Sequence, residues 1–185
     1  MKIISSIIIF SITLLASIAN SQKACNGYAE FCDRLYSNIA YITTHNSYSS
    51  SKLAAANQNF NISIQLKDGV RGFMLDSVYP ENNTNEVHLC HENCNLLDAG
   101  PAVDTLTVIT DWLNENPNEV ITIIWENTAN VPGSAYNDFY TKSGLDKFVY
   151  VQEEGQDWPT LGNMIESGKR VVNFINPPSD QPFPW

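Results

Sequence analysis

Positive charge is scarce in this sequence, which has 10 Lys and Arg residues against 20 Asp and Glu residues, for a formal net charge of -10. Nucleic-acid binding needs clustered Lys and Arg to neutralise phosphates, so this composition excludes nucleic acid as a partner. An anionic membrane would not attract such a chain over a long range either. Any peripheral membrane contact must therefore be local or through an apolar rim.

Apolar runs long enough to cross a membrane are also missing. The best candidate, residues 7–19, is shorter than the ~20 residues that a spanning helix needs. It follows Lys2, and small residues precede a cleavage site at Gln22. We therefore predict a signal peptide over residues 1–21, with a membrane anchor as the alternative, and a secreted domain over residues 22–185.

Cysteine is limited to four residues, Cys25, Cys32, Cys90 and Cys94. An even number of cysteines in a secreted chain predicts disulfides, and four allow three connectivities. Proximity in the sequence favours Cys25–Cys32 and Cys90–Cys94. Zinc is the alternative, but the spacings are not those of a zinc ribbon or finger, and the expected compartment is oxidising.

Short apolar runs alternate with helical patterns along the rest of the chain. The runs, rich in Val and Ile, are residues 39–44, 69–78, 87–90, 120–125, 148–151 and 170–175. Apolar residues recur at helical spacing over residues 101–116, which predicts an amphipathic helix. Thr160 is expected to cap another short helix that stops near Gly168. Strands that are apolar on both faces and alternate with helices predict an α/β fold with a parallel sheet.

Polar residues stand where four of these runs end. His45-Asn46 follows the first run, Asp76 lies near the end of the second, His91 closes the third, and Glu126-Asn127 closes the fourth. In parallel α/β folds, and above all in (β/α)8 barrels, chemistry gathers at the carboxyl ends of the strands. Polarity also resumes at strand ends for no functional reason. Two of the chain's three histidines at such positions nevertheless favour a shared site.

Side-chain alternation assigns Arg71 to a different place. If Asp76 points into the site, Arg71 points to the opposite face, beneath the helices. An ion pair there is its favoured role. Binding of the substrate or its phosphate is the weaker alternative for Arg71, and Asn46 and Asp76 are the other candidates for that role. The same reasoning puts His88 out of phase with His91, so His88 is predicted to be a bystander.

Several segments resemble the X domain of the phosphatidylinositol-specific phospholipases C. They are Thr44-His45-Asn46-Ser47-Tyr48, residues 65–76, His88-Leu89-Cys90-His91, residues 116–127, Asp157-Trp158-Pro159-Thr160-Leu161 and Lys169-Arg170-Val171-Val172. The motifs match in order and spacing over nearly all of the mature chain. The likeness is strongest to secreted X-domain proteins of fungi, oomycetes and plants.

The resemblance implies a TIM (β/α)8-type barrel and a phosphoric diester hydrolase that acts on phosphatidylinositol-like lipids or glycolipids. His45 would be the general base that deprotonates an inositol hydroxyl, and His91 the general acid that protonates the leaving diacylglycerol oxygen. The products would be a cyclic inositol phosphate and diacylglycerol. Imidazole suits both roles because it titrates near neutral pH.

The resemblance also implies a position for a cation. Calcium-dependent members of the family have an Asn and three acids where this chain has Asn46, Met74, Asp76 and Glu126. Three oxygen-bearing side chains predict at most weak Ca²⁺ binding, because Ca²⁺ takes 6–8 oxygen ligands and a thioether does not suit it. In the alternative interpretation, Asp76 and Glu126 hold His45 or Arg71 in place.

Complete barrels of this type run to about 250 residues, so the resemblance predicts a barrel truncated after about six strands. The late-strand carboxylate that supports the first histidine in the family would then be absent. A truncated, non-catalytic secreted protein that binds phospho-inositol head groups is the alternative function. A glycerophosphodiesterase is disfavoured because His45 is followed by Asn46-Ser47 rather than Arg-Gly.

Overall fold

The computed structural model describes residues 24–52, 55–81, 85–91 and 93–175. The predicted signal peptide, residues 1–21, lies outside the described residues. Within the described part of the chain, no helix is long and apolar enough to span a bilayer.

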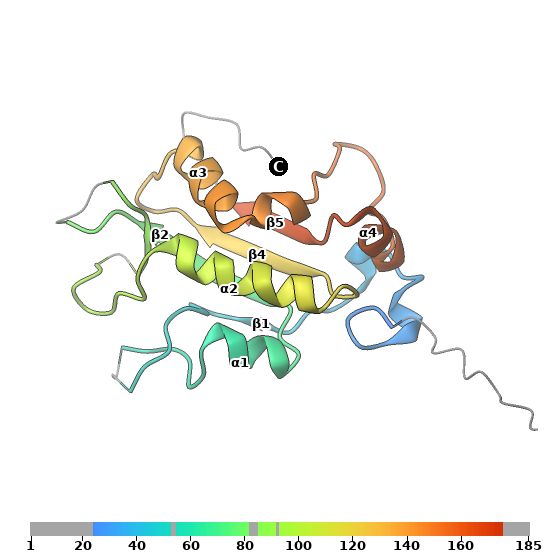
Figure 1. Ribbon diagram of the computed structural model, residues 1–185, viewed down its shortest axis with the longest axis horizontal. Coiled ribbons are helices and arrows are strands. Elements are labelled where there is room, and N and C mark those ends of the chain that lie inside the picture. Colours follow the sequence, from blue (N-terminus) through green and yellow to red (C-terminus); the bar gives the residue numbers. More distant parts are fainter. Residues whose placement is uncertain (1–23, 53–54, 82–84, 92, 176–185) are drawn as a thin grey trace, which may run out of the picture.

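A parallel sheet forms the centre of the molecule (Figure 1). Its strands are β1 (Thr43–Thr44), β2 (Gly72–Val78), β4 (Ile121–Glu126) and β5 (Val171–Ile175), in the spatial order β1-β2-β4-β5. The predicted α/β fold with a parallel sheet is therefore confirmed. All four strands run toward the left end of Figure 1, so their carboxyl ends meet there.

Two predicted strands differ from expectation. β3 (His88–Leu89) pairs antiparallel with the carboxyl-terminal end of β2, so the run 87–90 does not add a parallel strand. The run 148–151 overlaps the last residue of the short 3-10 helix η3 (Leu145–Phe148) and makes only an isolated bridge between Val149 and Val171. The described residues therefore hold four parallel strands rather than six, in an open sheet with β1 and β5 at its edges.

Helices cover one face of this sheet (Figure 1). α1 (Ile62–Lys67), α2 (Ala102–Glu115) and α3 (Gly133–Ser143) lie side by side there, and α2 contacts both of the others. α4 (Leu161–Ser167) and the 3-10 helices η1 (Ala29–Phe31) and η2 (Tyr36–Asn38) lie toward the amino ends of the strands. The helices predicted over residues 101–116 and after Thr160 are both confirmed.

The caps of α4 follow from its sequence. The Thr160 side chain accepts a hydrogen bond from the Asn163 amide at 3.2 Å, which satisfies a donor that the first helical turn leaves free. The helix ends at Gly168, whose φ of +74° is a left-handed conformation that glycine adopts without a steric penalty.

The core lies between the sheet and the helices. Phe73 and Leu75 of β2 are fully buried there, as are Leu106 and Ile109 of α2. The predicted phase of β2 is therefore correct: Phe73 and Leu75 face the helices, and Asp76 belongs to the alternate set. A second apolar cluster, which includes Tyr36, Val120, Leu161, Met164 and Val172, closes the amino end of the sheet.

Both predicted disulfides are present. Cys25–Cys32 belongs to the segment that covers the amino end of the sheet. Cys90–Cys94 closes a small loop directly after β3. The two bonds thus stiffen opposite ends of the sheet, and the second lies in the segment that carries His91.

Candidate active site

The turn that carries His45 is fixed to the neighbouring strand by Ser47. The Ser47 amide donates to the Met74 carbonyl at 2.9 Å, and the Ser47 hydroxyl accepts from the Met74 amide at 3.0 Å. Asn46, with a φ of +43°, takes the left-handed conformation in this tight turn, which Asn tolerates better than most residues. The turn therefore holds His45 and Asn46 beside the carboxyl-terminal half of β2.

Gln65 of α1 holds the same turn through hydrogen bonds. Its side-chain amide donates to the Ser47 carbonyl at 2.9 Å, and its side-chain oxygen accepts from the Thr44 hydroxyl at 2.7 Å. Gln58 donates to the His45 carbonyl at 2.6 Å, and Asn46 donates to the Asn57 side chain at 2.9 Å. These bonds hold the backbone on both sides of His45 and leave its imidazole exposed.

Asp76 is the buried acid of the site. It is 3% exposed and is paired in register with Glu126 on the adjacent strand β4. The Tyr48 hydroxyl donates to Asp76 Oδ2 at 2.6 Å. Burial raises the pKa of Asp76, the Tyr48 hydrogen bond opposes this, Glu126 adds to the rise, and His91 and His45 lower the pKa.

The groups that shift the pKa of Asp76 include three other predicted site residues, so all four share one electrostatic environment. Glu126 from β4, His91 from the loop after β3 and His45 from the turn after β1 all act on the pKa of Asp76 in β2. Tyr48 belongs to the same group: its pKa is raised by burial first, and then by its bond to Asp76. These effects on the pKa of Asp76 indicate that the two histidines and the two acids lie near one another, and of the four it is the histidines that line the cavity described below.

His91 reaches this site by a different route from the one predicted. We expected His91 to close a parallel strand, but β3 runs antiparallel to β2, with Leu89 opposite Ser77. The chain therefore comes back along β2 and delivers His91 to the carboxyl end from the opposite direction. The reason is a hairpin-like return after β2, which the apolar run alone could not reveal because both strand directions bury the same residues.

His45 and His91 line the same cavity, which has a volume of about 300 Å³. Its other walls include Asn46 and Tyr48 from the β1 turn and Leu96 and Leu97 from the loop after His91. Both imidazoles are exposed, so a ligand in the cavity can reach them. Two general acid–base groups that face one cavity suit a reaction in which one proton is taken and another is given.

Two acceptors at this site have no hydrogen-bond partner. Asn46 Oδ1 and Asp76 Oδ1 are both buried and unpaired, whereas most buried polar atoms in proteins are satisfied. Oxygen acceptors of this kind fit a hard cation or the hydroxyl groups of a ligand. The described residues contain no cluster of three or more His, Cys, Asp or Glu arranged for a metal, so any cation site here would need ligands from water or substrate.

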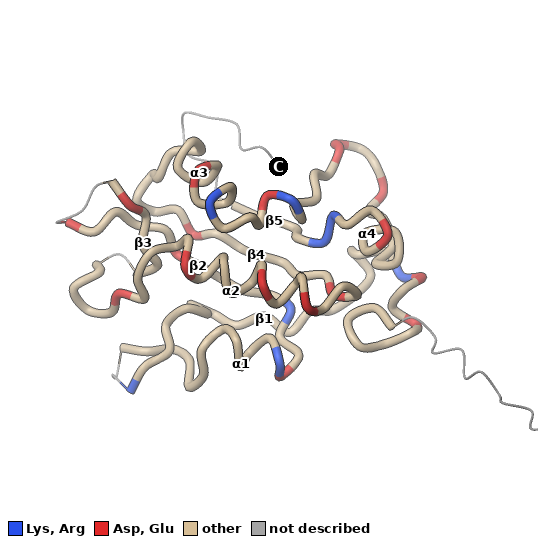
Figure 2. The backbone as a smooth tube through the Cα atoms, in the orientation of Figure 1, with Lys and Arg blue, Asp and Glu red and all other residues tan. Residues whose placement is uncertain are grey.

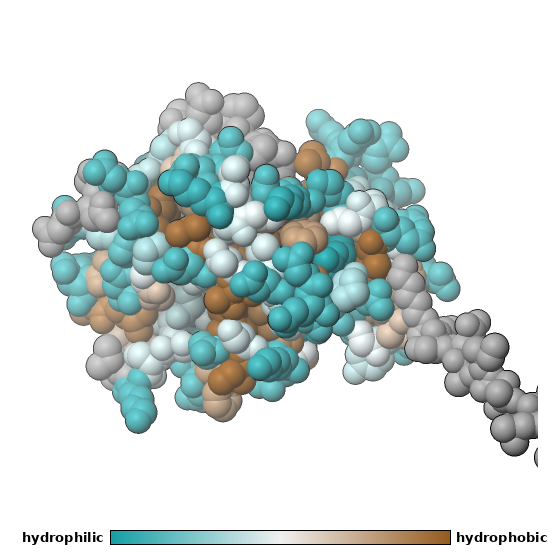
Figure 3. Space-filling view, in the orientation of Figure 1, coloured by the Kyte–Doolittle hydropathy of each residue, from teal (hydrophilic) through white to brown (hydrophobic). Residues whose placement is uncertain are grey.

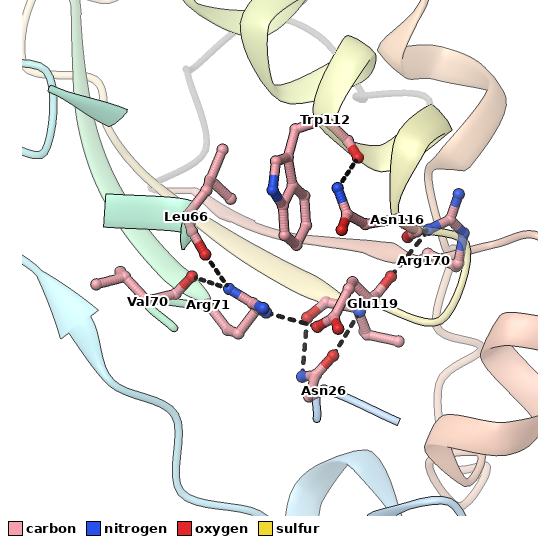
Figure 4. Close-up of polar contacts among 9 residues, drawn as sticks. Asn26, Leu66, Val70, Arg71, Trp112, Asn116, Glu119 and Arg170 are labelled. Atoms are coloured by element: carbon pink, nitrogen blue, oxygen red, sulfur yellow. Dashed lines mark hydrogen bonds and ion pairs between the residues drawn. The ribbon is translucent and has the colours of Figure 1, made fainter. Parts of the chain in front are cut away.

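Arg71 does not belong to this site. It lies at the amino end of β2, where its Nε donates to Glu119 Oε2 at 2.8 Å and its guanidinium lies 4.6 Å from the Trp112 ring centre (Figure 4). It also donates to the Leu66 and Val70 carbonyls at 2.8 Å. The predicted ion pair is confirmed, and these bonds fix the guanidinium at the end of the sheet opposite the histidines.

Sequence reasoning missed three residues of the site, Tyr48, Gln65 and Asn57. Tyr48 stands two residues after Asn46 in the first motif, so its position gave a usable signal. Gln65 gave a weaker one, as a polar residue on the apolar face of a short helix. Asn57 lies in a loop and gave none.

Comparison with known proteins identifies the family. The family model described as PI-PLC X 1 matches residues 31–183. The chain belongs to the PI-PLC X family. Its members include the "PI-PLC X domain-containing protein 1" of Arthroderma benhamiae, which is 29% identical over 98% of this chain and 61% of its own length.

Other curated relatives of the PI-PLC X chain are longer proteins too. An "Uncharacterized secreted protein" of the same fungus is 36% identical over 84% of this chain and 36% of its own length. An Arabidopsis thaliana PI-PLC X domain-containing protein is 31% identical over 76% of this chain and 36% of its own length. The chain thus spans between about a third and three fifths of these relatives.

Solved structures show a similar fold over about half of their own length. A phosphatidylinositol-specific phospholipase C of Staphylococcus aureus superposes with a TM-score of 0.60 at 18% identity, over 83% of this chain and 53% of that one. The enzyme of Listeria monocytogenes gives a TM-score of 0.51 at 17% identity, over 74% and 50% of the two chains. At these identities the likeness concerns the fold alone.

Proposed function

We propose that this PI-PLC X chain is a phosphodiesterase that cleaves phosphatidylinositol-like lipids with His45 as general base and His91 as general acid. The observation that carries the proposal is the shared cavity: both imidazoles line it, and both lower the pKa of Asp76. A cavity with an acid–base pair at its wall suits transfer of a phosphoryl group between two oxygens of one ligand.

The reaction balances with these two residues. Neutral His45 takes the proton of an inositol hydroxyl next to the phosphodiester, and that oxygen attacks phosphorus. The bond from phosphorus to the glycerol oxygen breaks, and protonated His91 gives its proton to that oxygen. The products are a cyclic inositol phosphate and diacylglycerol, and each histidine ends in the protonation state opposite to its starting one.

Negative charge on the phosphoryl oxygens needs a positive partner. Arg71 and Arg170 are held at the amino end of the sheet, and Figure 2 shows acidic segments among the loops at its carboxyl end. Asn46, Asp76 and Glu126 would hold a weakly bound Ca²⁺, which when bound would supply that positive charge. Met74, on the same face of β2 as Asp76, offers a thioether where an acid would complete the set.

Substrate access favours a lipid. Leu96, on the cavity wall, is 69% exposed, and Leu97 lies beside it. Figure 3 shows hydrophobic atoms over this loop at the left end of the molecule. Exposed apolar side chains beside a polar cavity let acyl chains remain in the membrane while the head group enters the site.

The chain acts outside the cell. One relative is named a secreted protein, and the described chain carries two disulfides, which persist in oxidising compartments. The substrates that it can reach are therefore lipids or glycolipids on the outer surface of a cell membrane.

A second candidate function is non-catalytic binding of a phospho-inositol head group. One observation favours it: none of the ion pairs or side-chain hydrogen bonds found among the described residues joins the His45 ring to a carboxylate. In serine-protease triads, replacing the orienting Asp lowers kcat by about 10⁴-fold. A binding protein would need the cavity and the unpaired acceptors but not an oriented base.

Vesicles that contain phosphatidylinositol, with phosphatidylcholine vesicles as the control, separate the two functions. An enzyme releases a water-soluble phosphate product from the inositol lipid only, and His45→Ala and His91→Ala abolish release. A binding protein cosediments with the inositol vesicles without release. Release that persists in both variants would overturn the assignment of the histidines.

A further inference from the structure

His88 has partners that a bystander would lack. Its Nδ1 lies 2.9 Å from both carboxylate oxygens of Asp98. A carboxylate only accepts hydrogen bonds, so the His88 proton stands on Nδ1 and is donated to Asp98. The His88 side chain is 15% exposed, and its Nε2 makes no hydrogen bond, with Glu86 Oε2 3.7 Å away.

This pair closes the base of the loop that carries His91. Leu89 donates to the Gly100 carbonyl and accepts from the Ala99 amide, each at 3.0 Å, so the two arms of the loop run together. Asp98 Oδ1 also accepts from the Gly100 amide at 2.7 Å. Asp98 thus bonds to both arms, to one through His88 and to the other through Gly100.

The same segment is fixed to the sheet on its other side. Leu89 is opposite Ser77 in the antiparallel pair of β3 with β2, and Leu89 and Cys90 are fully buried. His91 follows directly. The position of its backbone is therefore set by the short β3 ladder, by the Cys90–Cys94 disulfide and by the His88–Asp98 pair. With only two residues, β3 is too short to fix the loop alone.

We propose that His88 and Asp98 form a positioning pair that holds His91 at the angle and depth its acid role requires. The proposal rests on the proposed function. Neither residue lines the cavity that His45 and His91 share, so the pair would act through His91 and not by contact with a ligand in that cavity. The sequence predicts that His88 is a bystander, and this proposal gives it instead a role in the support of His91.

A positioning role has a defined kinetic signature. A displacement of about 1 Å at a reacting group costs on the order of 10²-fold in rate, whereas ground-state binding by the rest of the cavity is preserved. Loss of the His88–Asp98 bond should therefore lower kcat by about 10- to 100-fold and leave KM within about 2-fold. Loss of an ordinary packing residue would lower the fraction of folded protein instead.

His88→Asn and His88→Gln make a matched test. The Asn side-chain nitrogen stands close to the position of Nδ1 and can still donate to Asp98, whereas that of Gln stands near Nε2 and cannot. We expect His88→Asn to retain kcat within about 3-fold, and His88→Gln and Asp98→Ala to fall together. Equal kcat values in the Asn and Gln variants would overturn the pairing.

A readout without turnover separates this proposal from the proposed function. The chain has three histidines, so the ring signals in a ¹H–¹³C spectrum can be assigned by substitution. The His91 signal should stay in place in His88→Asn and shift in His88→Gln. An unmoved His91 signal in His88→Gln would refute positioning even if the chain cleaves lipid. A fully active His91→Ala variant would instead refute the proposed function.

Discussion

The two ends of the sheet differ in whether their buried polar groups have partners. At the amino end, Arg71 is paired with Glu119 and with two carbonyls, and Arg170 donates to the Leu113, Asn116 and Glu119 carbonyls at 2.9–3.1 Å. At the carboxyl end, Asn46 Oδ1 and Asp76 Oδ1 are buried and unpaired.

The difference separates stability from function along one set of strands. The fold depends on the satisfied charges beneath the helices, because removing one partner of a buried pair such as Arg71–Glu119 leaves the other charge uncompensated. Unsatisfied acceptors cost free energy in the ligand-free chain, and a ligand that pairs with them recovers it. This division is typical of parallel α/β folds, in which the carboxyl ends of the strands carry the functional site and the amino ends contribute to stability.

The largest effect is expected at the carboxyl end. His45→Ala and His91→Ala should each lower phosphatidylinositol turnover by roughly 10²–10⁴-fold, because a positioned acid or base contributes about that much. The double variant should lose little more than either single one, as groups that act as a unit are not additive. Thermal unfolding checks that both variants remain folded, since neither imidazole is buried.

Arg71→Ala should mark the amino end as structural. Breaking a buried ion pair costs about 3–5 kcal/mol, and partial exposure of this pair places it near the lower figure. Chemical denaturation measures the loss, and Arg71→Lys should recover part of it because Lys keeps the charge but not the fork of donors. Turnover per folded molecule should not change, and a selective loss of turnover would indicate that Arg71 serves the substrate after all.

Asp76→Asn should stabilise the fold while it impairs function. Burial raises the pKa of Asp76, so the folded state keeps a proton that the unfolded chain has already lost. Its contribution to the unfolding free energy therefore falls as pH rises from the unfolded pKa, near 4, through the raised folded pKa. At neutral pH the variant should therefore have a higher Tm than the parent, by about 2–4 °C for each kcal/mol gained. The Tm difference between variant and parent, followed against pH, should vanish below pH 4.

Met74→Glu should give the smallest effect, visible only in cation binding. It adds a carboxylate on the Asp76 face of β2, close to Asn46 and opposite Ile124 of β4. Calorimetric titration should show tighter Ca²⁺ binding than in the parent, and Met74→Gln should not. No difference between the two variants would mean that Asn46, Asp76 and Glu126 do not converge on a cation.

Much of this comparison could be predicted from the sequence. Side-chain alternation along β2 placed Arg71 and Asp76 on opposite faces of the strand. The ends of the apolar runs before Asn46 and Glu126 marked where two strands end. These signals are local, because side-chain alternation and the end of an apolar run lie within one segment.

The rest depends on contacts between distant segments. The direction of β3 is set by its pairing with β2, which the run 87–90 does not encode. The run 148–151 begins inside η3 and forms a single bridge at Val149, and neither feature can be read from its apolar residues alone. The roles of Gln65 and of the His88–Asp98 pair arise from partners 18 and 10 residues away.

The central claim, that His45 and His91 cleave an inositol phosphodiester at the carboxyl end of this sheet, is tested most directly by ³¹P NMR. Phosphatidylinositol vesicles are incubated with the parent chain or with His91→Ala, with and without Ca²⁺. We predict that a cyclic phosphate signal grows with the parent and not with the variant. A spectrum in which the parent leaves the lipid signal unchanged, although it cosediments with the vesicles, would contradict the claim and favour a head-group binding protein.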